Sequence, residues 1–214
     1  MIIKKTVPLL LKRKQANPLP VMEHFYTLQG EGAWTGTPTY FIRLAGCDVG
    51  CSWCDVKASW VPHERQYASV LDIVNLAKSS TAKRVVITGG EPSIYDLSLL
   101  TSQLHQAGFL VHIETAGPHE LLGDFDWICF SPKKFLVPKE EYYQLAHELK
   151  IIIYNSHDFK WAEMHAEKCA STVQLFLQAE WSKRERFYPE IVSYIQAHPH
   201  WRLSMQTHKY LEIP

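Results

Sequence analysis

The fold of this chain is decided by residues 84–114, which read RVVITGGEPSIYDLSLLTSQLHQAGFLVHIE. The β-branched run at residues 84–88 predicts a buried strand, which ends at a double glycine. Apolar residues then recur at helical spacing over residues 97–107, and Gly108 is typical of a helix C-cap. A second strand follows at residues 109–114. The stretch therefore predicts a strand–helix–strand unit with parallel strands.

Similar patterns recur on both sides of this unit. Runs rich in β-branched and aromatic residues predict further strands at residues 39–44, 126–130, 149–154, 173–178 and 201–206. Helices are predicted at residues 70–77 and 184–197. Six or seven strands are too few for a closed eight-stranded barrel. We therefore expect an α/β fold, an open partial parallel β/α barrel, with ligands at the carboxyl ends of its strands.

The composition is that of an ordinary globular protein, with 46% hydrophobic and 21% charged residues in a chain of 214. Lys plus Arg and Asp plus Glu both number 22, so the chain lacks the basic excess of proteins that bind long stretches of nucleic acid. No apolar run approaches the roughly 18 residues that span a bilayer, which predicts no membrane partner. Residues 1–21 are expected to form an N-terminal arm and residues 22–214 the partial-barrel domain.

Three of the five cysteines lie within eight residues, in the sequence GCDVGCSWCD at 46–55. An odd, clustered set without an export signal argues against disulfides and predicts a reducing, cytoplasmic location. The spacing C-x3-C-x2-C brings three thiolates onto one loop, whereas a 4Fe–4S cluster normally takes four cysteines. The cluster would keep one iron open for a substrate or cosubstrate. Zinc held with a nearby histidine such as His63, or three ordinary thiols, are the alternatives on spacing alone.

Polar residues follow several of the predicted strands. The turn TGGEP at residues 88–92 allows close approach of a ligand to the backbone, and a carboxylate at Glu91 could accept from an ammonium group. Arg43 lies inside an apolar strand and needs an anionic partner, either a substrate carboxylate or an internal Asp or Glu. The apolar residues of the C-terminal tail, residues 204–214, predict that it packs against the domain rather than fraying.

These motifs, taken in order, resemble one enzyme family. The cysteine spacing resembles that of radical S-adenosylmethionine (SAM) enzymes. Together with LQGEG, FIRLAGC, VVITGGEP, IETAG, SPK and the terminal QTHKYL, it resembles the 7-carboxy-7-deazaguanine synthase family. The resemblance runs from about residue 22 to residue 214 and omits only the N-terminal arm.

The resemblance implies a carbon–nitrogen lyase of queuosine and 7-deazapurine biosynthesis. In that family an electron reduces the cluster, SAM is cleaved, and 6-carboxy-5,6,7,8-tetrahydropterin contracts to 7-carboxy-7-deazaguanine with loss of ammonia. The family also implies a homodimer, Mg²⁺ near the substrate and an electron donor such as a flavodoxin. Two other functions stay open at this point: a glycyl-radical activase, although activases lack the QTHKY tail, and a non-catalytic paralogue that keeps the cluster.

Site residues follow from the motifs by position. The resemblance implies a 4Fe–4S cluster on Cys47, Cys51 and Cys54. It implies SAM contacts at Gly90, Glu91, Ser131, Pro132, Lys133 and Gln178. It implies a pterin pocket formed by Leu28, Gln29, Gly30, Arg43, Thr88, Glu114, His208 and Pro214. One position departs from the family: Val56 stands where a threonine or serine hydroxyl usually helps to hold Mg²⁺, which puts the ion in doubt for this chain.

Overall fold

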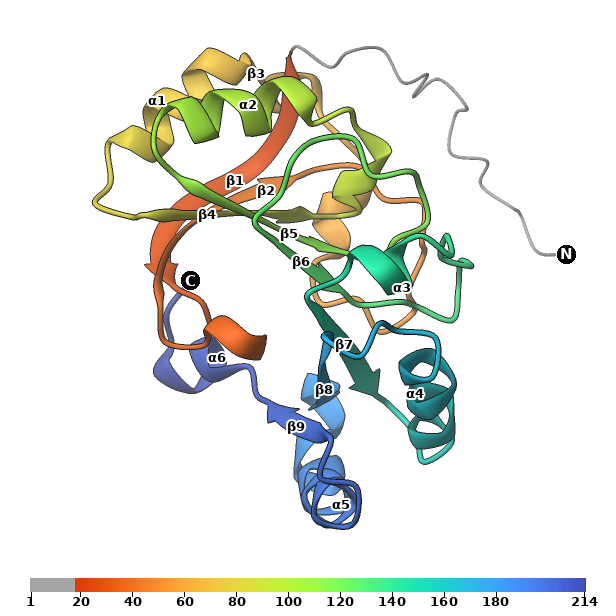
Figure 1. Ribbon diagram of the computed structural model, residues 1–214. Helices are drawn as coiled ribbons and strands as arrows, with labels where there is room; N and C mark the ends of the chain where they lie inside the picture. Colours follow the sequence, from red (N-terminus) through yellow and green to blue (C-terminus); the bar gives the residue numbers. More distant parts are fainter. Residues whose placement is uncertain (1–17) are drawn as a thin grey trace, which may run out of the picture.

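The computed structural model describes residues 18–214, which form one open, curved sheet with helices on its convex side (Figure 1). Within these residues the sheet has nine strands, in the order β3-β1-β2-β4-β5-β6-β7-β8-β9. Their bounds are β1 Leu19–Leu28, β2 Pro38–Leu44, β3 Tyr67–Ala68, β4 Arg84–Gly89, β5 Leu110–Thr115, β6 Trp127–Phe130, β7 Glu148–Ile153, β8 Gln174–Ala179 and β9 Trp201–Ser204. The helices are α1 Val70–Lys78, α2 Ser98–Gln106, α3 Tyr142–Leu145, α4 Asp158–Ala166, α5 Arg184–Ala197 and α6 Thr207–Leu211.

Seven consecutive strands of the sheet, β2-β4-β5-β6-β7-β8-β9, are parallel to one another, as the sequence predicted. Strands β1 and β3 were not predicted. Strand β1 pairs antiparallel with β2, and β3 pairs antiparallel with β1 at the edge of the sheet. Strand β3 pairs with only Leu19 and Pro20, so the rest of β1 has no neighbour on that side and its sequence includes the exposed, charged Glu23. The sheet does not close, which confirms the open partial barrel.

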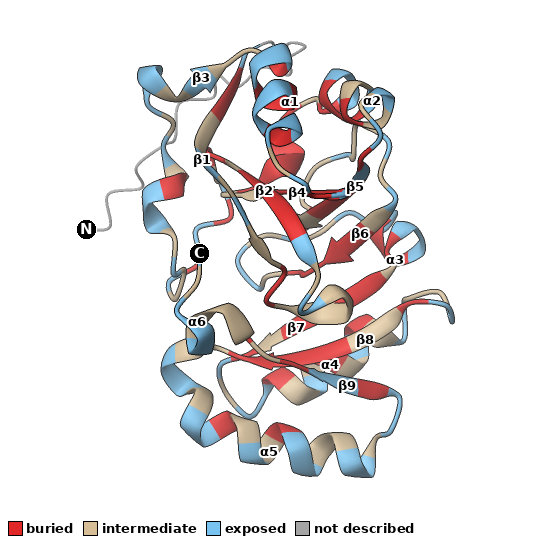
Figure 2. Cartoon of the chain, turned by 90° about the vertical axis from the view of Figure 1, so that its left-hand side faces the viewer, coloured by how far each residue is buried: buried red, intermediate tan, exposed pale blue. Residues whose placement is uncertain are grey.

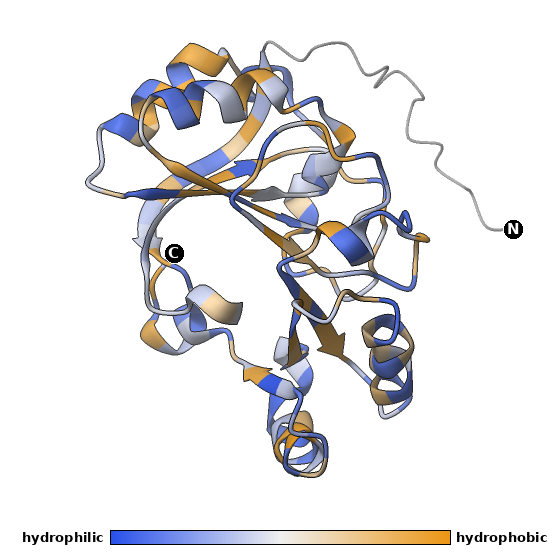
Figure 3. Cartoon of the chain, viewed as in Figure 1, coloured by the Kyte–Doolittle hydropathy of each residue, from blue (hydrophilic) through white to orange (hydrophobic). Residues whose placement is uncertain are grey.

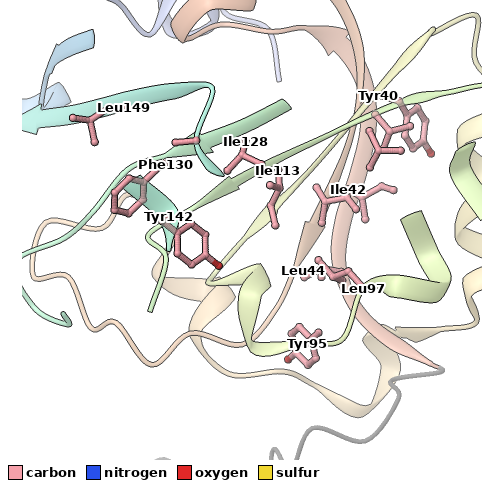
Figure 4. Packing of buried hydrophobic residues seen from close by; sticks show 14 of the residues in the cluster. Tyr40, Ile42, Leu44, Tyr95, Leu97, Ile113, Ile128, Phe130, Tyr142 and Leu149 are labelled. Atoms are coloured by element: carbon pink, nitrogen blue, oxygen red, sulfur yellow. The ribbon is translucent and has the colours of Figure 1, made fainter. Parts of the chain in front are cut away.

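The convex face of the sheet packs against helices over a single apolar core. Helix α1 directs Val70, Ile73 and Val74 inward, and its exposed positions alternate with buried ones in Figure 2. Figure 3 shows the same division in hydropathy along α1 and α2. In Figure 4, side chains of the strands meet those of the helical layer and its loops, among them Ile42, Leu97, Ile113, Phe130 and Tyr142. This core fixes the parallel strands in register.

The opposite, concave face of the sheet is more polar than the apolar runs suggested. In β7 the alternate residues Leu149, Ile151 and Ile153 belong to the core, whereas Glu148 and Lys150 point to the other side. In β5 the core residues Val111 and Ile113 alternate with His112 and Glu114 in the same way. Successive side chains of a strand point to opposite faces of the sheet. One strand therefore contributes apolar side chains to the core and polar side chains to the concave face.

The C-terminal segment crosses the open side of the sheet. In Figures 1 and 2, α6 and the C-terminus lie between the end of β1 and β9. Thr207 donates its backbone N–H to the carbonyl of Gly30 over 2.9 Å, which ties α6 to the loop after β1. Residues 18–214 contain no helix with the length and apolar character needed to cross a membrane. Of the predicted N-terminal arm, residues 1–17 lie outside the described residues, and Leu19 already begins β1 with its side chain fully buried.

Candidate active site

A cavity of about 270 Å³ opens at the carboxyl ends of the strands. It extends from the cysteine loop to the segment after β1 and the C-terminal residue. Nearly every residue predicted to bind the cluster, SAM or substrate lines it. These residues are Cys47, Cys51, Cys54, Gly90, Glu91, Ser131, Lys133, Gln178, Leu28, Gln29, Gly30, Arg43, Thr88, Glu114, His208 and Pro214. Pro132 does not line the cavity; it connects two residues that do.

The cysteine loop, residues 46–55, is held at its N-terminal end by backbone hydrogen bonds. Gly46 donates to the carbonyl of Ser59 at 2.7 Å, and Cys47 donates to that of Trp60 at 3.1 Å. All three thiols are unpaired. Burial raises the pKa of Cys51 to about 11, while the nearby Lys133 cation opposes that rise. The loop therefore presents three free thiols to one cavity, beside the partly buried Lys133 cation.

The same loop is not arranged around a single ion. Residues 18–214 contain no group of three or more His, Cys, Asp or Glu side chains placed to hold one metal ion. His63, the candidate fourth zinc ligand, is exposed and does not line the cavity. A mononuclear site draws its ligands around one centre, whereas an iron–sulfur cluster distributes them over separate irons. The zinc alternative thus lacks a preformed site in the described part of the chain.

The double-glycine turn after β4 presses against the cysteine loop. A Cβ atom at Gly90 would lie 2.3 Å from the carbonyl oxygen of Gly46 and 2.8 Å from the Cβ of Cys47, so only glycine fits. The backbone N–H of Gly90 donates to the carbonyl of Leu44 at 2.9 Å, and that of Glu91 donates to Gly46 at 2.8 Å. These contacts place the turn directly beside the first cysteine.

The Glu91 side chain has a different position from the one that the sequence suggested. Its carboxylate is only 1% exposed and accepts hydrogen bonds from Ser93, Thr115 and Ala116. Protein donors thus engage both oxygens. In this structure the residue fixes the ends of β4 and β5 together, and the backbone of the turn faces the cavity.

Polar contacts also link the segment after β6 to β7, and β8 to β9. Lys133 donates to the Oγ of Ser131 at 2.7 Å, and Ser131 donates to the backbone carbonyl of Lys150 at 2.7 Å. Burial lowers the pKa of Lys133. On the next strand, Gln178 accepts a 2.6 Å hydrogen bond from Ser204, which fixes its amide at the cavity wall.

The far end of the cavity holds an acidic network that sequence reasoning only partly found. Lys150 bridges two carboxylates, at 2.5 Å from Glu31 and 3.1 Å from Glu114. Gln29 donates to Glu114 at 2.9 Å, and Gln206 donates to Glu31 at 2.9 Å. Glu31, Lys150 and Gln206 were not among the predicted site residues. The signal for Lys150 was a lone charge inside the apolar run LKIIIY, because a buried lysine requires partners.

Arg43 has an internal acidic partner and also faces the cavity. Its Nε donates to Glu23 at 2.6 Å, across the register pair that joins β1 and β2. Within residues 18–214 its two Nη nitrogens have no hydrogen-bond partner. The two alternatives for Arg43 are therefore compatible, because the guanidinium meets Glu23 on one edge and leaves its fork for a ligand.

The tail packs against the cavity, as its apolar residues predicted. His208 lies on Gly30, where an added Cβ would come within 2.1 Å of the imidazole Nδ1. Lys209 forms a 2.7 Å ion pair with Asp55, the residue after the last cysteine of the loop. Burial lowers the pKa of His208, against the attraction of Glu31. The tail thereby links the acidic network to the cysteine loop.

Val56 lies at the cavity wall and offers no side-chain oxygen. Its backbone carbonyl already accepts from the Oγ of Ser59 at 2.6 Å, and the neighbouring Asp55 is paired with Lys209. A hard cation such as Mg²⁺ requires oxygen ligands. The residues present at this position do not fit the ion.

Residues 41–149 match the model of the radical SAM superfamily. The chain is similar to the 7-carboxy-7-deazaguanine synthase of Flavobacterium psychrophilum, with 52% identity over 92% of this chain and 93% of that protein. The enzyme of the same name from Synechocystis is 47% identical over 91% of this chain and 93% of its own length. A crystal structure of QueE from Escherichia coli superposes with a TM-score of 0.78, at 33% identity, over 88% of this chain and 93% of that one.

Proposed function

The chain belongs to the 7-carboxy-7-deazaguanine synthase family of radical SAM enzymes, and we propose that the cavity at the strand ends is where it carries out the family's reaction. It is a carbon–nitrogen lyase of queuosine biosynthesis, which contracts 6-carboxy-5,6,7,8-tetrahydropterin to 7-carboxy-7-deazaguanine with release of ammonia. The observation that carries the assignment of the site is one cavity that is lined by three free thiols at one end and by an acidic, amide-rich pocket at the other.

The radical SAM family implies a 4Fe–4S cluster and SAM. We assign the cluster to Cys47, Cys51 and Cys54, since these are the cysteines that line the cavity. Cys129 is buried beneath the wall and Cys169 lies outside it, so the cavity provides no fourth thiolate. When bound, the cluster supplies the electron for reductive cleavage of SAM.

We assign SAM to the wall between the cysteine loop and β8, at Gly90, Glu91, Ser131, Pro132, Lys133 and Gln178. The inward-facing Glu91 carboxylate supports a role in shaping the turn, which leaves the backbone around Gly90 to meet the methionine end of SAM. Lys133 and Gln178 line this wall, and both carry side-chain N–H donors. The protein here supplies position and electrostatics, while the cofactors supply the radical chemistry.

We assign the pterin to the opposite end, at Leu28, Gln29, Gly30, Arg43, Thr88, Glu114, His208 and Pro214. A pterin has amino and ring N–H donors on one edge, and this pocket offers carboxylate acceptors at Glu114 and Glu31. The substrate also carries a carboxylate, which matches the unoccupied fork of Arg43. The substrate would thus be held by complementary groups at two edges.

The test is anaerobic reconstitution with iron and sulfide, followed by turnover with SAM, a reductant and the carboxy-tetrahydropterin. We expect about four irons per chain, as a cubane cluster requires, and formation of 7-carboxy-7-deazaguanine with ammonia. A protein that cleaves SAM without binding the pterin would support an activase. One that binds the pterin without product would support a non-catalytic paralogue. Colourless protein that carries only zinc would refute the cluster assignment.

We further propose that this enzyme turns over without Mg²⁺, because no side-chain oxygen is present at Val56 and Asp55 is already paired. This differs from the requirement that the family resemblance implied.

We also propose a cytoplasmic homodimer that receives its electron from a flavodoxin-type carrier. Within the cysteine loop, Trp53 stacks on Tyr154 and meets the exposed Phe135, which gives a carrier an apolar approach to the cluster. Five unpaired cysteines support a reducing compartment. Light scattering of the holoenzyme and turnover with purified flavodoxin against dithionite test the two partners separately.

A further inference from the structure

Lys150 is a buried cation that none of the predicted roles uses. It projects from the middle of β7 to the cavity wall, and its side chain is only 4% exposed. A buried lysine is stable as a cation only when acidic groups surround it. Those groups come from segments far apart in the sequence, Glu31 after β1 and Glu114 in β5.

We propose that Lys150 is a positioning residue, whose ammonium holds the carboxylates of Glu31 and Glu114 side by side as acceptors for the N–H edge of the substrate. This inference rests on the proposed pterin pocket and adds the group that keeps its acidic wall in a binding-competent form. The ligand class is a planar heterocycle with adjacent amino and ring N–H donors.

The geometry shows how both carboxylates are fixed. Each one meets the Lys150 ammonium through one oxygen and a side-chain amide through the other. Glu31 accepts from Gln206 and Glu114 accepts from Gln29, both at 2.9 Å. Every carboxylate oxygen has two lone pairs, so each keeps acceptor capacity after these bonds. The side chains of Glu31 and Glu114 are 15% and 22% exposed, so both still reach the cavity above the nearly covered lysine.

The electrostatic reason for a cation is the proximity of like charges. Two carboxylates that share a site disfavour each other's ionised form, and one of them then takes up a proton. A protonated carboxyl loses an acceptor that faces the substrate. Burial alone would raise the pKa of Glu31, but the attraction and hydrogen bond of Lys150, with smaller effects of Gln206 and His208, bring it down to about 2.

The other ionisable groups around Lys150 do not replace it. Glu148, on the same face of β7, accepts from the backbone of Ala33 at 2.9 Å, and burial raises its pKa. Burial also raises the pKa of the Cys129 thiol, which adjoins Glu148. His208 faces Glu31 with a lowered pKa, and Lys133 donates to Ser131 instead. Lys150 is therefore the cation that contacts both Glu31 and Glu114.

The test measures binding of the carboxy-tetrahydropterin to cluster-loaded, SAM-bound enzyme without reductant, by anaerobic calorimetry from pH 5 to 8. Lys150→Met should weaken binding by about 10- to 100-fold at pH 7, the range expected when hydrogen bonds to charged groups are lost. The affinity of Lys150→Met for the pterin should also fall as the pH drops from 8 to 5, because either Glu31 or Glu114 then takes up a proton in this range. Wild type and Lys150→Arg, which retains the charge, should show a flat profile. Lys168→Met, on the surface, is the matched control.

A rescue experiment separates positioning from mere folding. In Lys150→Met, replacing Glu31 with Gln removes the like-charge conflict, so the double variant should recover the flat pH profile of pterin binding. Equal affinity and equal pH profile for wild type and Lys150→Met would overturn the inference. If Lys150→Met does not fold, a pH-dependent profile for Lys150→Arg would overturn it as well. SAM cleavage by the reduced enzyme measures the function of the cluster and the SAM site independently of pterin binding. Wild type that cleaves SAM but does not bind the pterin would overturn the proposed function together with this inference.

Discussion

The hydroxyl of Thr115 lies 2.5 Å from the Oε1 atom of Glu91, although the two residues are 24 positions apart in the chain. Thr115 ends β5, and Glu91 follows β4, so this contact ties two neighbouring strand ends at the rim of the cavity. Ser93 and Ala116 add further donors to the same buried carboxylate. The turn that presses Gly90 against Cys47 is held from behind by this cluster.

Glu91→Gln should destabilise the protein although it preserves size. The amide NH₂ would face N–H or O–H donors, and leaving buried donors unsatisfied costs about 1–3 kcal/mol. We expect a loss of this size in the free energy of unfolding, measured by urea denaturation, together with lower iron content after reconstitution. The control Glu167→Gln, at an exposed position, should stay within about 0.5 kcal/mol of wild type. Wild-type stability in Glu91→Gln would show that the carboxylate is not structural.

Val56→Thr should create a response to Mg²⁺. Wild-type turnover is expected to be the same after chelation with EDTA and after addition of Mg²⁺, because the cavity wall lacks an oxygen at this position. The variant places a hydroxyl there, so its KM for the pterin should fall when Mg²⁺ is added. Val61→Thr, at an exposed valine outside the cavity, controls for the added hydroxyl and should show no response. Loss of wild-type activity in EDTA, restored by Mg²⁺, would contradict the proposal.

Arg43→Lys should raise the KM for the pterin more than it lowers kcat. Lysine keeps the charge but loses the planar fork that can bind a carboxylate through two nitrogens. A lost charge-assisted hydrogen bond corresponds to about a tenfold or larger rise in KM. Glu23→Gln leaves the fork intact and removes only the charge on the Nε side, so its effect should be much smaller. If both variants had the same KM, the fork would not be the substrate contact.

Stability should fall as the pH drops below about 6.5 because of buried neutral histidines. Burial, assisted by the Lys168 cation, lowers the pKa of His165 from 6.5 to about 4. Between pH 6.5 and about 4 the histidine is protonated in the unfolded state but neutral in the folded state. The free energy of unfolding therefore decreases as the pH falls through this range. The loss is about 1.4 kcal/mol per pH unit for one fully differential proton.

The measurement is urea denaturation of wild type and His165→Gln at pH 7, 6 and 5. His165 contacts the Tyr143 hydroxyl at 2.8 Å, so the variant is expected to be less stable at pH 7. Its stability should nevertheless fall less steeply with pH than that of wild type, because the titrating group is gone. His112, whose pKa burial lowers to about 3, keeps part of the acid sensitivity in both proteins. If the free energy of unfolding fell equally steeply with pH in the two proteins, His165 would not contribute to the acid sensitivity.

Local patterns were sufficient for the parallel strands and for the cysteine loop. The helix predicted at residues 184–197 is observed as α5 with the same bounds, although Pro189 lies inside it. Strand β1 was missed because Glu23 and His24 interrupt its apolar pattern, and α4 was missed because it lacks a clear apolar stripe. Periodicity reports which face of an element is buried, and these two elements expose too much of their surface to show it.

The sequence by itself determined which chemical groups the chain offers: three thiols at fixed spacing, a double glycine after a strand, and polar residues at successive strand ends. Only the tertiary structure decided which side chains meet. It turned Glu91 inward toward Thr115, paired Arg43 with Glu23, and set Lys150 between Glu31 and Glu114. The reason is that spacing along the chain fixes the side of a strand on which a residue lies, whereas contacts between distant segments depend on sheet register and curvature, which the packed core sets.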